Sequence, residues 1–250
     1  MGEIHMIPLK INNYNHMKTL ITIALIFVAA TSFSTKGFAT GLTDTEKEGI
    51  QLMREEEKLA HDVYIFLYDK WNMRIFSNIS NAESHHFEAI GYLIDNYGLK
   101  DGAKEGAGNF NNNELQELYN SLTEKGSQSL IAAFEVGALI EEVDIADLQK
   151  LLAVGQDSIV AGVYQNLLRG SENHIRAFTR QLESQNVKYT PTVLSETIYA
   201  EILEGTHQKG DPNSCVLPNN NCPNNNMSGK NKGRGKGRGK GKGCGQGGWN

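Results

Sequence analysis

The sequence predicts an all-α fold built around four long amphipathic helices. Apolar residues recur at helical spacing through residues 43–205, and no sustained alternation of apolar and polar residues interrupts them. The same stretch contains a single proline, Pro191, so long helices can run through it without a break. Four long helices joined by connections of mixed length predict a helical bundle.

The first predicted helix begins at Thr43 or Asp44, either of which is a good N-cap, and runs to about Trp71. Its apolar face follows a spacing of four and three residues. That face contains Met53, Glu57, Ala60, Tyr64, Leu67 and Trp71. The second helix covers about residues 77–97 and stops before Gly98.

A Gly- and Asn-rich connection follows, and we expect a short extra helix over about residues 113–125. The third long helix covers about residues 127–144 and extends to Leu152 in the longer interpretation. The fourth begins near Gln156 or Asp157 and ends near Ser184. A short C-terminal helix is predicted over residues 194–203 and is expected to pack on the bundle. Residues 40–205 thus form one domain.

The N-terminal segment, residues 1–39, is interpreted as an upstream extension followed by a signal peptide over about residues 17–39. Lys18 precedes an uncharged stretch, and the small residues Gly37 and Ala39 suit a cleavage site. This length is short for a membrane span, so we expect an exported protein whose mature chain has no integral membrane span. An uncleaved membrane anchor is the alternative.

The C-terminal segment, residues 206–250, is rich in Asn and Pro and then in Gly, Lys and Arg, and it offers little apolar surface to bury. Disorder is therefore predicted. Residues 230–242 form a Gly-spaced basic run, which is either a solubilising tail or a salt-sensitive attachment to a polyanion. Cys215, Cys222 and Cys244 lie in this tail, where a Cys215–Cys222 disulfide suits an exported protein.

Each of the four long helices places acidic or imidazole side chains on or beside its apolar face. These are Glu56 and Glu57, then Glu83 and His86, then Glu141 and Asp144, and finally His174. An isolated buried carboxylate is expensive, and one on every helix would unfold an ordinary domain unless something compensated the charge. A bound iron, manganese or zinc ion resolves that cost. The alternative is a buried Glu–His hydrogen bond at Glu83 and His86.

Two spacings carry a resemblance to a known superfamily. Glu57 and Tyr64 have the Glu-x6-Tyr spacing of first helices in the ferritin-like superfamily, and Glu83-x-x-His86 is similar to its second-helix motif. The segments "EEEKLAHDVY", "AESHH", "VGALIEEVDIADL" and "LLRGSENHIRAF" resemble more closely the prokaryotic ferritin-like family catalogued as domain of unknown function 2202. The resemblance covers about residues 43–205.

The resemblance implies a ferritin-like four-helix bundle with a metal site inside it. The implied ligands are Glu57, Glu83, His86, Glu141 and His174, and the supporting or alternative ligands are Glu56, Tyr64, Glu142 and Asp144. One departure concerns the fourth helix, which in this superfamily carries Glu-x-x-His, whereas Ser171 stands three residues before His174 here. A symmetric di-iron site therefore requires Asp144 or Glu142 to replace the missing carboxylate.

We accordingly expect an exported metal-binding protein, with iron, as one ion or as a di-iron pair, or else manganese or zinc. The implied chemistry is ferroxidase-type oxidation of Fe(II) by O₂ or peroxide. The alternative is a non-catalytic binding or scaffold module whose basic tail does the work. A homo-oligomer stays open, although nothing in the sequence reveals a cage interface. Spacing alone leaves Glu56 against Glu57, and Glu141 against Glu142, undecided.

Overall fold

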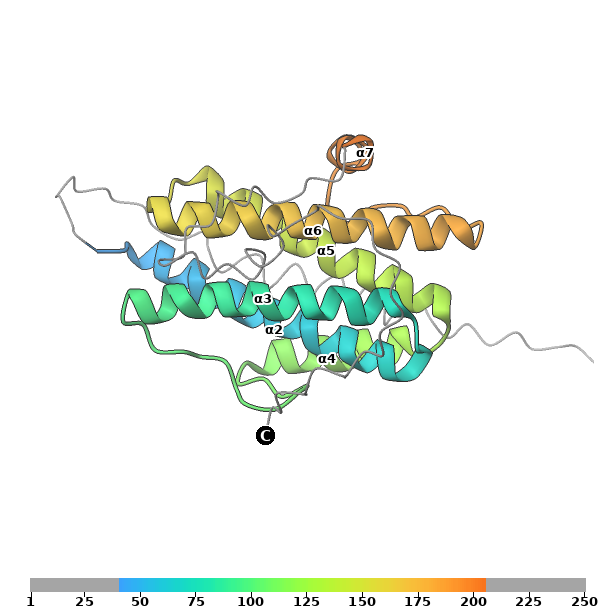
Figure 1. Ribbon diagram of the computed structural model, residues 1–250, viewed down its shortest axis with the longest axis horizontal. Helices are drawn as coiled ribbons and strands as arrows, with labels where there is room; N and C mark the ends of the chain where they lie inside the picture. Colours follow the sequence, from blue (N-terminus) through green and yellow to red (C-terminus); the bar gives the residue numbers. More distant parts are fainter. Residues whose placement is uncertain (1–40, 206–250) are drawn as a thin grey trace, which may run out of the picture.

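A computed structural model describes residues 41–205 and shows six helices and, within those residues, no β-strand (Figure 1). The predicted all-α class is confirmed. The helices are α2 (Asp44–Trp71), α3 (Arg74–Asn96), α4 (Asn113–Gly126), α5 (Leu130–Ala153), α6 (Ser158–Ser184) and α7 (Glu196–Glu204). The four long helices of the prediction are α2, α3, α5 and α6, and the two short ones are α4 and α7.

The long helices pack chiefly as two pairs, α2 with α3 and α5 with α6. The two pairs meet where α2 contacts α5 and where α3 contacts α6. Figure 1 shows all four running along the long axis of the molecule, with α4 beside α2 and with α7 seen end-on against α6. A side chain at the middle of any long helix can therefore face the interior shared by all four.

The N-caps explain where several helices begin. Thr43 and Glu46 form a capping box, in which Thr43 Oγ1 accepts a hydrogen bond from the Glu46 backbone and Glu46 accepts one from the Thr43 backbone. Asp157 caps α6 by accepting from the Ile159 backbone N–H at 2.8 Å. The sequence pointed to both of these cap positions.

Three helix starts differ from the expected positions, and one of them is α7, which begins at Glu196 rather than at residue 194 because Ser195 caps it. Helix α3 begins at Arg74, three residues before the predicted Ser77, because Asn72 adopts a left-handed conformation (φ 51°) that reverses the chain within two residues. Helix α5 begins at Leu130 rather than at residue 127, because Ser129 caps it. It then continues to Ala153, which agrees with the longer of the two predicted ends.

The core consists of two hydrophobic clusters with a polar layer between them. The first cluster includes Tyr64 and Leu67 of α2, Phe76 of α3, Phe134 of α5 and Phe178 of α6. The second includes Ile50 and Met53 of α2, Ile90 of α3, Leu148 of α5 and Val163 of α6. On each long helix the acidic or histidine residues predicted for the site fall between these two sets of core residues. The helices thus bring all of these groups to one level.

Several expectations lie outside the described residues. They concern the upstream extension and signal peptide (residues 1–39), the tail (206–250), its basic run (230–242) and the three cysteines, Cys215, Cys222 and Cys244. Within residues 41–205, no helix is both long enough and apolar enough to cross a membrane.

Candidate metal centre

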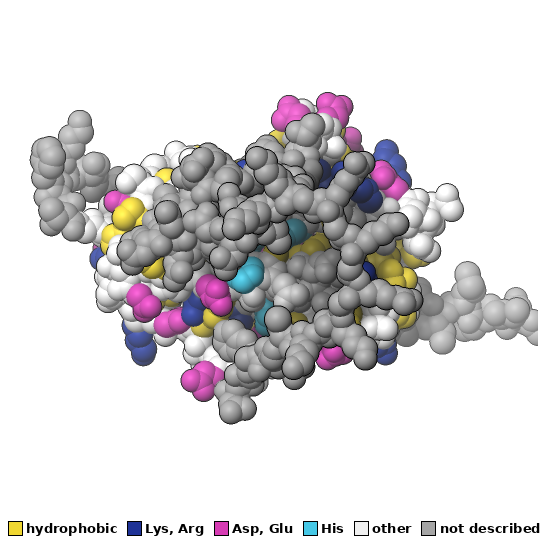
Figure 2. All heavy atoms as spheres, in the orientation of Figure 1, with side chains coloured by type: hydrophobic (Ala, Val, Ile, Leu, Met, Phe, Trp, Pro, Cys, Tyr) yellow, Lys and Arg dark blue, Asp and Glu magenta, His cyan; other side chains and the backbone are white. Residues whose placement is uncertain are grey.

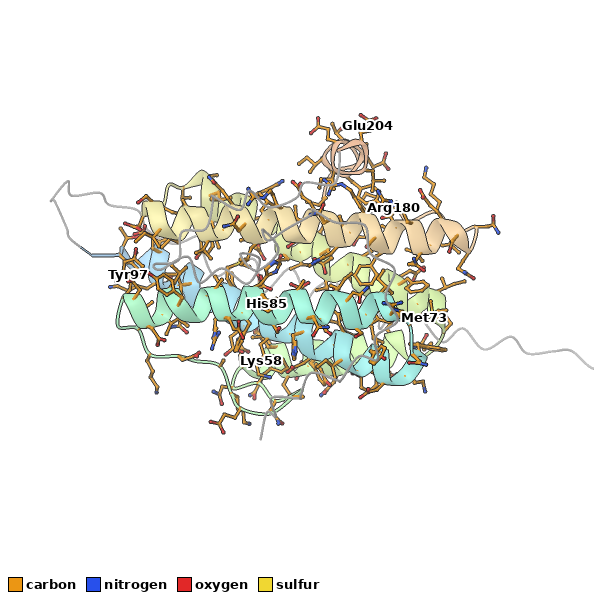
Figure 3. The ribbon with its side chains drawn as sticks, in the orientation of Figure 1. Lys58, Met73, His85, Tyr97, Arg180 and Glu204 are labelled. Carbon is orange, nitrogen blue, oxygen red and sulfur yellow. The ribbon has the colours of Figure 1, made fainter. Side chains whose placement is uncertain are left out.

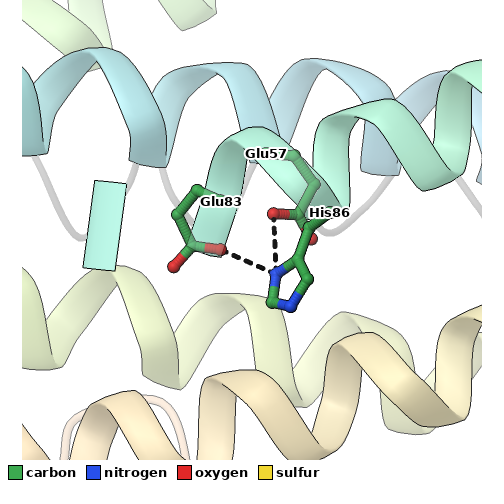
Figure 4. A group of neighbouring side chains, drawn as sticks. All are labelled: Glu57, Glu83 and His86. Carbon is green, nitrogen blue, oxygen red and sulfur yellow. Dashed lines mark hydrogen bonds and ion pairs between the residues drawn. The ribbon is translucent and has the colours of Figure 1, made fainter. Parts of the chain in front are cut away.

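The first half of the polar layer is formed by Glu57, Glu83 and His86 (Figure 4). His86 Nδ1 lies 2.7 Å from Glu83 Oε2 and 3.3 Å from Glu57 Oε2, so one imidazole nitrogen faces carboxylates from two helices. Glu83 and His86 are one helical turn apart on α3, whereas Glu57 reaches across from α2. One ligand atom from each residue lies within 4.8 Å of the others.

The second half is formed by Glu83, Glu141 and His174, which also place one ligand atom each within 4.8 Å of one another. His174 Nδ1, from α6, lies 2.8 Å from Glu83 Oε1 and 3.4 Å from Glu141 Oε2 of α5. Glu83 therefore belongs to both halves and presents a different oxygen to each. This is the geometry of a carboxylate that can bridge two neighbouring cations.

The carboxylates of the polar layer are more deeply buried than its imidazoles. The side chains of Glu57, Glu83 and Glu141 are 2–3% exposed, against 16% for His86 and 12% for His174. Figure 2 shows histidine side chains near the middle of the face on which α3 and α6 lie. The acids thus lie toward the interior of the layer, and the imidazoles lie on the side nearer to solvent.

The charges of the layer depend on one another. Burial raises the pKa of Glu83, but the imidazoles of His174 and His86 overcome that effect and hold the pKa well below its usual range. Burial opposes the charged form of His174 as well, yet Glu83 and Glu141 raise its pKa to about 10. Glu83 is thus a carboxylate held between two cationic imidazoles when no metal is bound.

The pKa values of Glu141 and Asp144 shift in the opposite direction to that of Glu83. Burial, followed by the negative charge of Glu83, raises the pKa of Glu141 to about 7, and burial followed by Glu141 raises that of Asp144 to about 7. Glu141 also accepts a hydrogen bond from the Tyr64 hydroxyl at 2.5 Å, which fixes one of its oxygens. These two acids are crowded by neighbouring carboxylates, and a divalent cation would relieve that repulsion.

Several buried atoms of the layer have no hydrogen-bond partner among the described residues. They are Glu57 Oε1, Glu83 Oε1, Asp144 Oδ1 and His174 Nδ1. Glu83 Oε1 and His174 Nδ1 lie within ion-pair distance, but their directions do not make a hydrogen bond. Unpartnered buried polar atoms are costly, and the two that also have no ion-pair partner, Glu57 Oε1 and Asp144 Oδ1, fit a set of cation ligands.

Asp144 occupies the place that the fourth helix leaves without a carboxylate. It lies one turn after Glu141 on α5, and its Oδ2 accepts a hydrogen bond from Ser171 Oγ of α6. Ser171 is the residue that stands where Glu-x-x-His would place an acid. The carboxylate in this region therefore comes from α5, and α6 supplies the hydroxyl that orients it.

Glu142 is turned away from the two triads, and Glu56 belongs to neither of them. Glu142 is buried, and it accepts hydrogen bonds from the Tyr189 hydroxyl and from the backbone N–H groups of Thr192, Val193 and Leu194 at 2.8–3.0 Å. It anchors the segment that leads to α7, so Glu141 is the acid of this pair that faces the layer. Glu56 lies next to Asp147 of α5 instead of beside a histidine.

Comparison with known proteins places this arrangement in a family. The family model described as an uncharacterized protein domain, DUF2202, matches residues 46–206. The uncharacterized protein MJ0754 of Methanocaldococcus jannaschii is 44% identical over 170 residues, which cover 68% of this chain and 92% of that protein. The chain belongs to the DUF2202 family.

A solved structure supports the fold of this DUF2202 domain. The crystal structure of hypothetical protein MJ0754 from Methanococcus jannaschii is similar with a TM-score of 0.65 at 41% sequence identity. The similarity covers 71% of the present chain and 100% of the crystallised chain. The part of the chain that carries the polar layer therefore corresponds to a fold seen in a crystal.

Two residues near the layer of this DUF2202 chain were not predicted from the sequence. Asp147 is 4% exposed and lies one turn after Asp144, so its spacing on α5 could have revealed it. Gly170 is the other, because a Cβ at this position would lie 2.4 Å from Cε1 of the His86 ring. A glycine within a long helix, four residues before a site histidine, was the available signal.

His85 behaves as an ordinary surface residue beside the site. Its side chain, labelled in Figure 3, is 53% exposed and lies 3.5 Å from Glu88. The adjacent His86 is turned inward at 16% exposure. Of the two neighbouring histidines, only His86 can serve the polar layer.

Proposed function

We propose that this chain is a ferritin-like four-helix protein that binds two metal ions in the polar layer, with iron as the metal. The observation that carries the proposal is the position of Glu83, which presents Oε2 to His86 and Oε1 to His174. Each half then has one imidazole and its own further carboxylate, Glu57 or Glu141. Paired carboxylate-and-imidazole sets in the middle of four helices are typical of di-iron and di-manganese proteins.

The donor set suits iron and manganese better than the softer metals. It consists of carboxylates and two imidazoles, and no cysteine lies within the described residues 41–205. Asp144, oriented by Ser171, supplies a further carboxylate near Glu57 and Glu141. Zinc remains an alternative occupant because it also accepts imidazole and carboxylate ligands.

The proposed chemistry is oxidation of Fe(II) by O₂ or peroxide. Bound iron supplies the redox step, since it cycles between the ferrous and ferric states. The protein contributes fixed carboxylates that favour the more highly charged ferric product, and Tyr64 holds Glu141 in place through its hydroxyl. Export through the segment 17–39 would place this activity outside the cytoplasm.

A non-catalytic scaffold is the second candidate, and one observation favours it. His86 Nδ1 and Glu83 Oε2 lie 2.7 Å apart, so these two side chains can satisfy each other through a hydrogen bond. Against it stand the unpartnered oxygens of Glu57 and Asp144, which a satisfied scaffold would not leave in its core. In this candidate the basic run 230–242 would bind a polyanion in a salt-sensitive way.

Anaerobic titration of the metal-free protein with Fe(II), followed by exposure to O₂, tests the proposal. We expect saturation near two Fe(II) per chain, followed by oxidation faster than that of free Fe(II) in the same buffer. The Glu83→Gln variant should lose both binding and oxidation. Binding of Fe(II) that is equal in the wild-type protein and in Glu83→Gln would overturn the proposal.

A further inference from the structure

A small cavity inside the bundle adjoins the polar layer at its carboxylates. The volume of the cavity is about 30 Å³, and Glu57, Glu83 and Glu141 of the two triads border it. The two site histidines, His86 and His174, do not. The candidate metal centre thus has imidazoles on its more exposed side and a cavity on its carboxylate side.

The outer wall of the cavity is built mainly from leucines. Helix α4 packs on α2 and α5 and covers the cavity from that side. Five leucines of these three helices line it, and each of them is at most 7% exposed. They are Leu59, Leu115, Leu118, Leu122 and Leu139. The short extra helix therefore closes an apolar space directly against the polar layer.

The character of the wall favours an apolar guest over water. A buried water molecule needs about two to four polar partners, and apolar cavities stay dry and take up apolar guests instead. Apolar atoms form nearly all of the surface of this cavity. Glu57 and Asp144, whose buried oxygens lack partners, also border it, but polar atoms contribute little to that surface.

The volume of the cavity limits the guest to a very small molecule. A water-sized probe needs about 10–15 Å³ measured in this way, so the cavity has room for roughly two such positions. An apolar cavity that takes up benzene measures about 150 Å³. A diatomic molecule therefore fits this space, whereas an aromatic ring or a hydrocarbon chain does not.

We propose that this cavity is a binding site for O₂ beside the metal centre. O₂ is diatomic and apolar, so it matches both the volume and the wall. Hydrogen peroxide donates and accepts hydrogen bonds, and it would lose them in an apolar space. The cavity stands on its own geometry, whereas the choice of O₂ as its guest rests on the proposed function. Of the two oxidants considered there, this inference selects O₂.

The position of the cavity lets O₂ and the metal ions be bound at the same time. The imidazoles of His86 and His174 lie on the more exposed side of the layer, and the leucine-lined cavity meets the layer at its carboxylates. O₂ therefore does not compete with solvent for its place beside the centre. Its reduction to hydrogen peroxide takes one electron from each of two Fe(II) ions, together with two protons.

Nuclear magnetic resonance of the metal-free, full-length protein under O₂ pressure tests the site without any reaction. O₂ is paramagnetic and accelerates the relaxation of methyl groups close to it, and N₂ at the same pressure is the reference. The Leu118 methyl groups should show an enhancement several times that of Leu194. Leu194 is the matched residue, because both leucines are 7% exposed and Leu194 does not line the cavity.

Leu118→Phe should fill the cavity and abolish the excess relaxation at the Leu122 methyl groups. Ala60→Val is a second filling variant, since Ala60 also lines the cavity and gains two methyl groups. It replaces Leu118→Phe if circular dichroism shows that the larger side chain prevents folding. Equal enhancement at Leu118 and Leu194 in the wild-type protein would overturn the O₂ site.

Rapid mixing of the Fe(II)-loaded protein with each oxidant tests the role of the site. Leu118→Phe should bind as much Fe(II) as the wild type and react several-fold more slowly with O₂, but at the wild-type rate with hydrogen peroxide. The control Leu194→Phe should match the wild type with both oxidants. A folded, cavity-filled variant that reacts with O₂ as fast as the wild type would overturn this role.

The two readouts separate this inference from the proposed function. Excess relaxation at the Leu118 and Leu122 methyl groups in a protein that binds no Fe(II) would overturn the proposed function and leave the cavity as a site for an apolar gas. Fe(II) binding at two ions per chain, with equal relaxation at Leu118 and Leu194, would overturn the O₂ site and leave the metal centre standing.

Discussion

Ser171 of α6 donates its hydroxyl hydrogen bond to Asp144 of α5, within the layer that also contains Glu141 and His174. The fourth helix thus supports a carboxylate that it does not itself carry. Removing a group that orients a ligand typically costs 10–100-fold in metal affinity. This contact makes the role of Asp144 testable without altering a candidate ligand.

Ser171→Ala should weaken metal binding by about 10–100-fold, because Asp144 loses the donor that orients it. Equilibrium dialysis with Mn²⁺ measures the change. Ser84→Ala is the matched control, since the Ser84 hydroxyl bonds to the backbone of its own helix, at Asn81. Equal affinities for the two variants would show that the Ser171 hydroxyl does not orient a metal ligand.

Glu83→Gln and Glu57→Gln should differ in the number of metal ions lost. Glu83 belongs to both triads and Glu57 to one of them. We expect Glu83→Gln to abolish tight binding of both ions, whereas Glu57→Gln loses the ion beside His86 and keeps the one beside His174. Elemental analysis after gel filtration gives the counts. The same count for both variants would contradict a shared carboxylate.

Gly170→Ala should weaken metal binding in the wild-type protein, but it should stabilise the helix when His86 is removed. The added Cβ would collide with the His86 ring, so the ring must move. In the His86→Ala background that collision is gone, and Gly170→Ala should raise the free energy of unfolding by about 1 kcal/mol through helix propensity. A double-mutant cycle on chemical denaturation measures this reversal. Gly170→Ala with unchanged metal affinity would argue against His86 as a ligand.

The metal-free protein should lose stability as the pH rises from about 5 to 8. Glu141 and Asp144 have pKa values raised to about 7 in the folded chain, so the stability that their protonated forms contribute is complete below their ordinary values and is lost as the pH rises through 7. The pKa of His174, raised to about 10, acts in the same direction at higher pH.

Glu83 has the opposite effect on stability at low pH, because its pKa is lowered in the folded protein. The stability that its charged form contributes is lost as the pH falls below the ordinary pKa of a glutamate. Metal binding needs deprotonated carboxylates, so the rise in melting temperature on adding Mn²⁺ should grow between pH 5 and pH 8. Melting curves at four pH values, with and without Mn²⁺, test both trends. A metal-free melting temperature that rises toward pH 8 would contradict the assignment of Glu141 and Asp144 as crowded buried acids.

Helical periodicity predicted the helices because the apolar faces are long and the caps are local. Thr43 and Asp157 each mark a start through a hydrogen bond within their own turn, which sequence alone can reveal. The start of α3 was predicted three residues too late, because it depends on the left-handed conformation of Asn72, which the sequence pattern does not indicate. Boundaries set by such turns are the least predictable part of a helical fold.

For the site, the sequence indicated which residue types face inward but left neighbouring acids unresolved. Glu141 and Glu142 differ by one step of the helix, and both prove to be buried. What separates them is tertiary: Glu142 satisfies three backbone N–H groups at residues 192–194, whereas Glu141 meets His174. The Ser171–Asp144 contact likewise joins two helices, so no spacing within one helix could predict it.

The central claim is that the layer shared by Glu57, Glu83, His86, Glu141 and His174 is a metal centre. Elemental analysis of residues 40–210, purified without a histidine tag, tests it most directly when paired with melting curves before and after chelation. We expect one to two equivalents of iron or manganese per chain, and a melting temperature that falls on chelation and recovers when the metal is restored. Metal-free protein whose melting temperature ignores both chelator and added metal would contradict the claim.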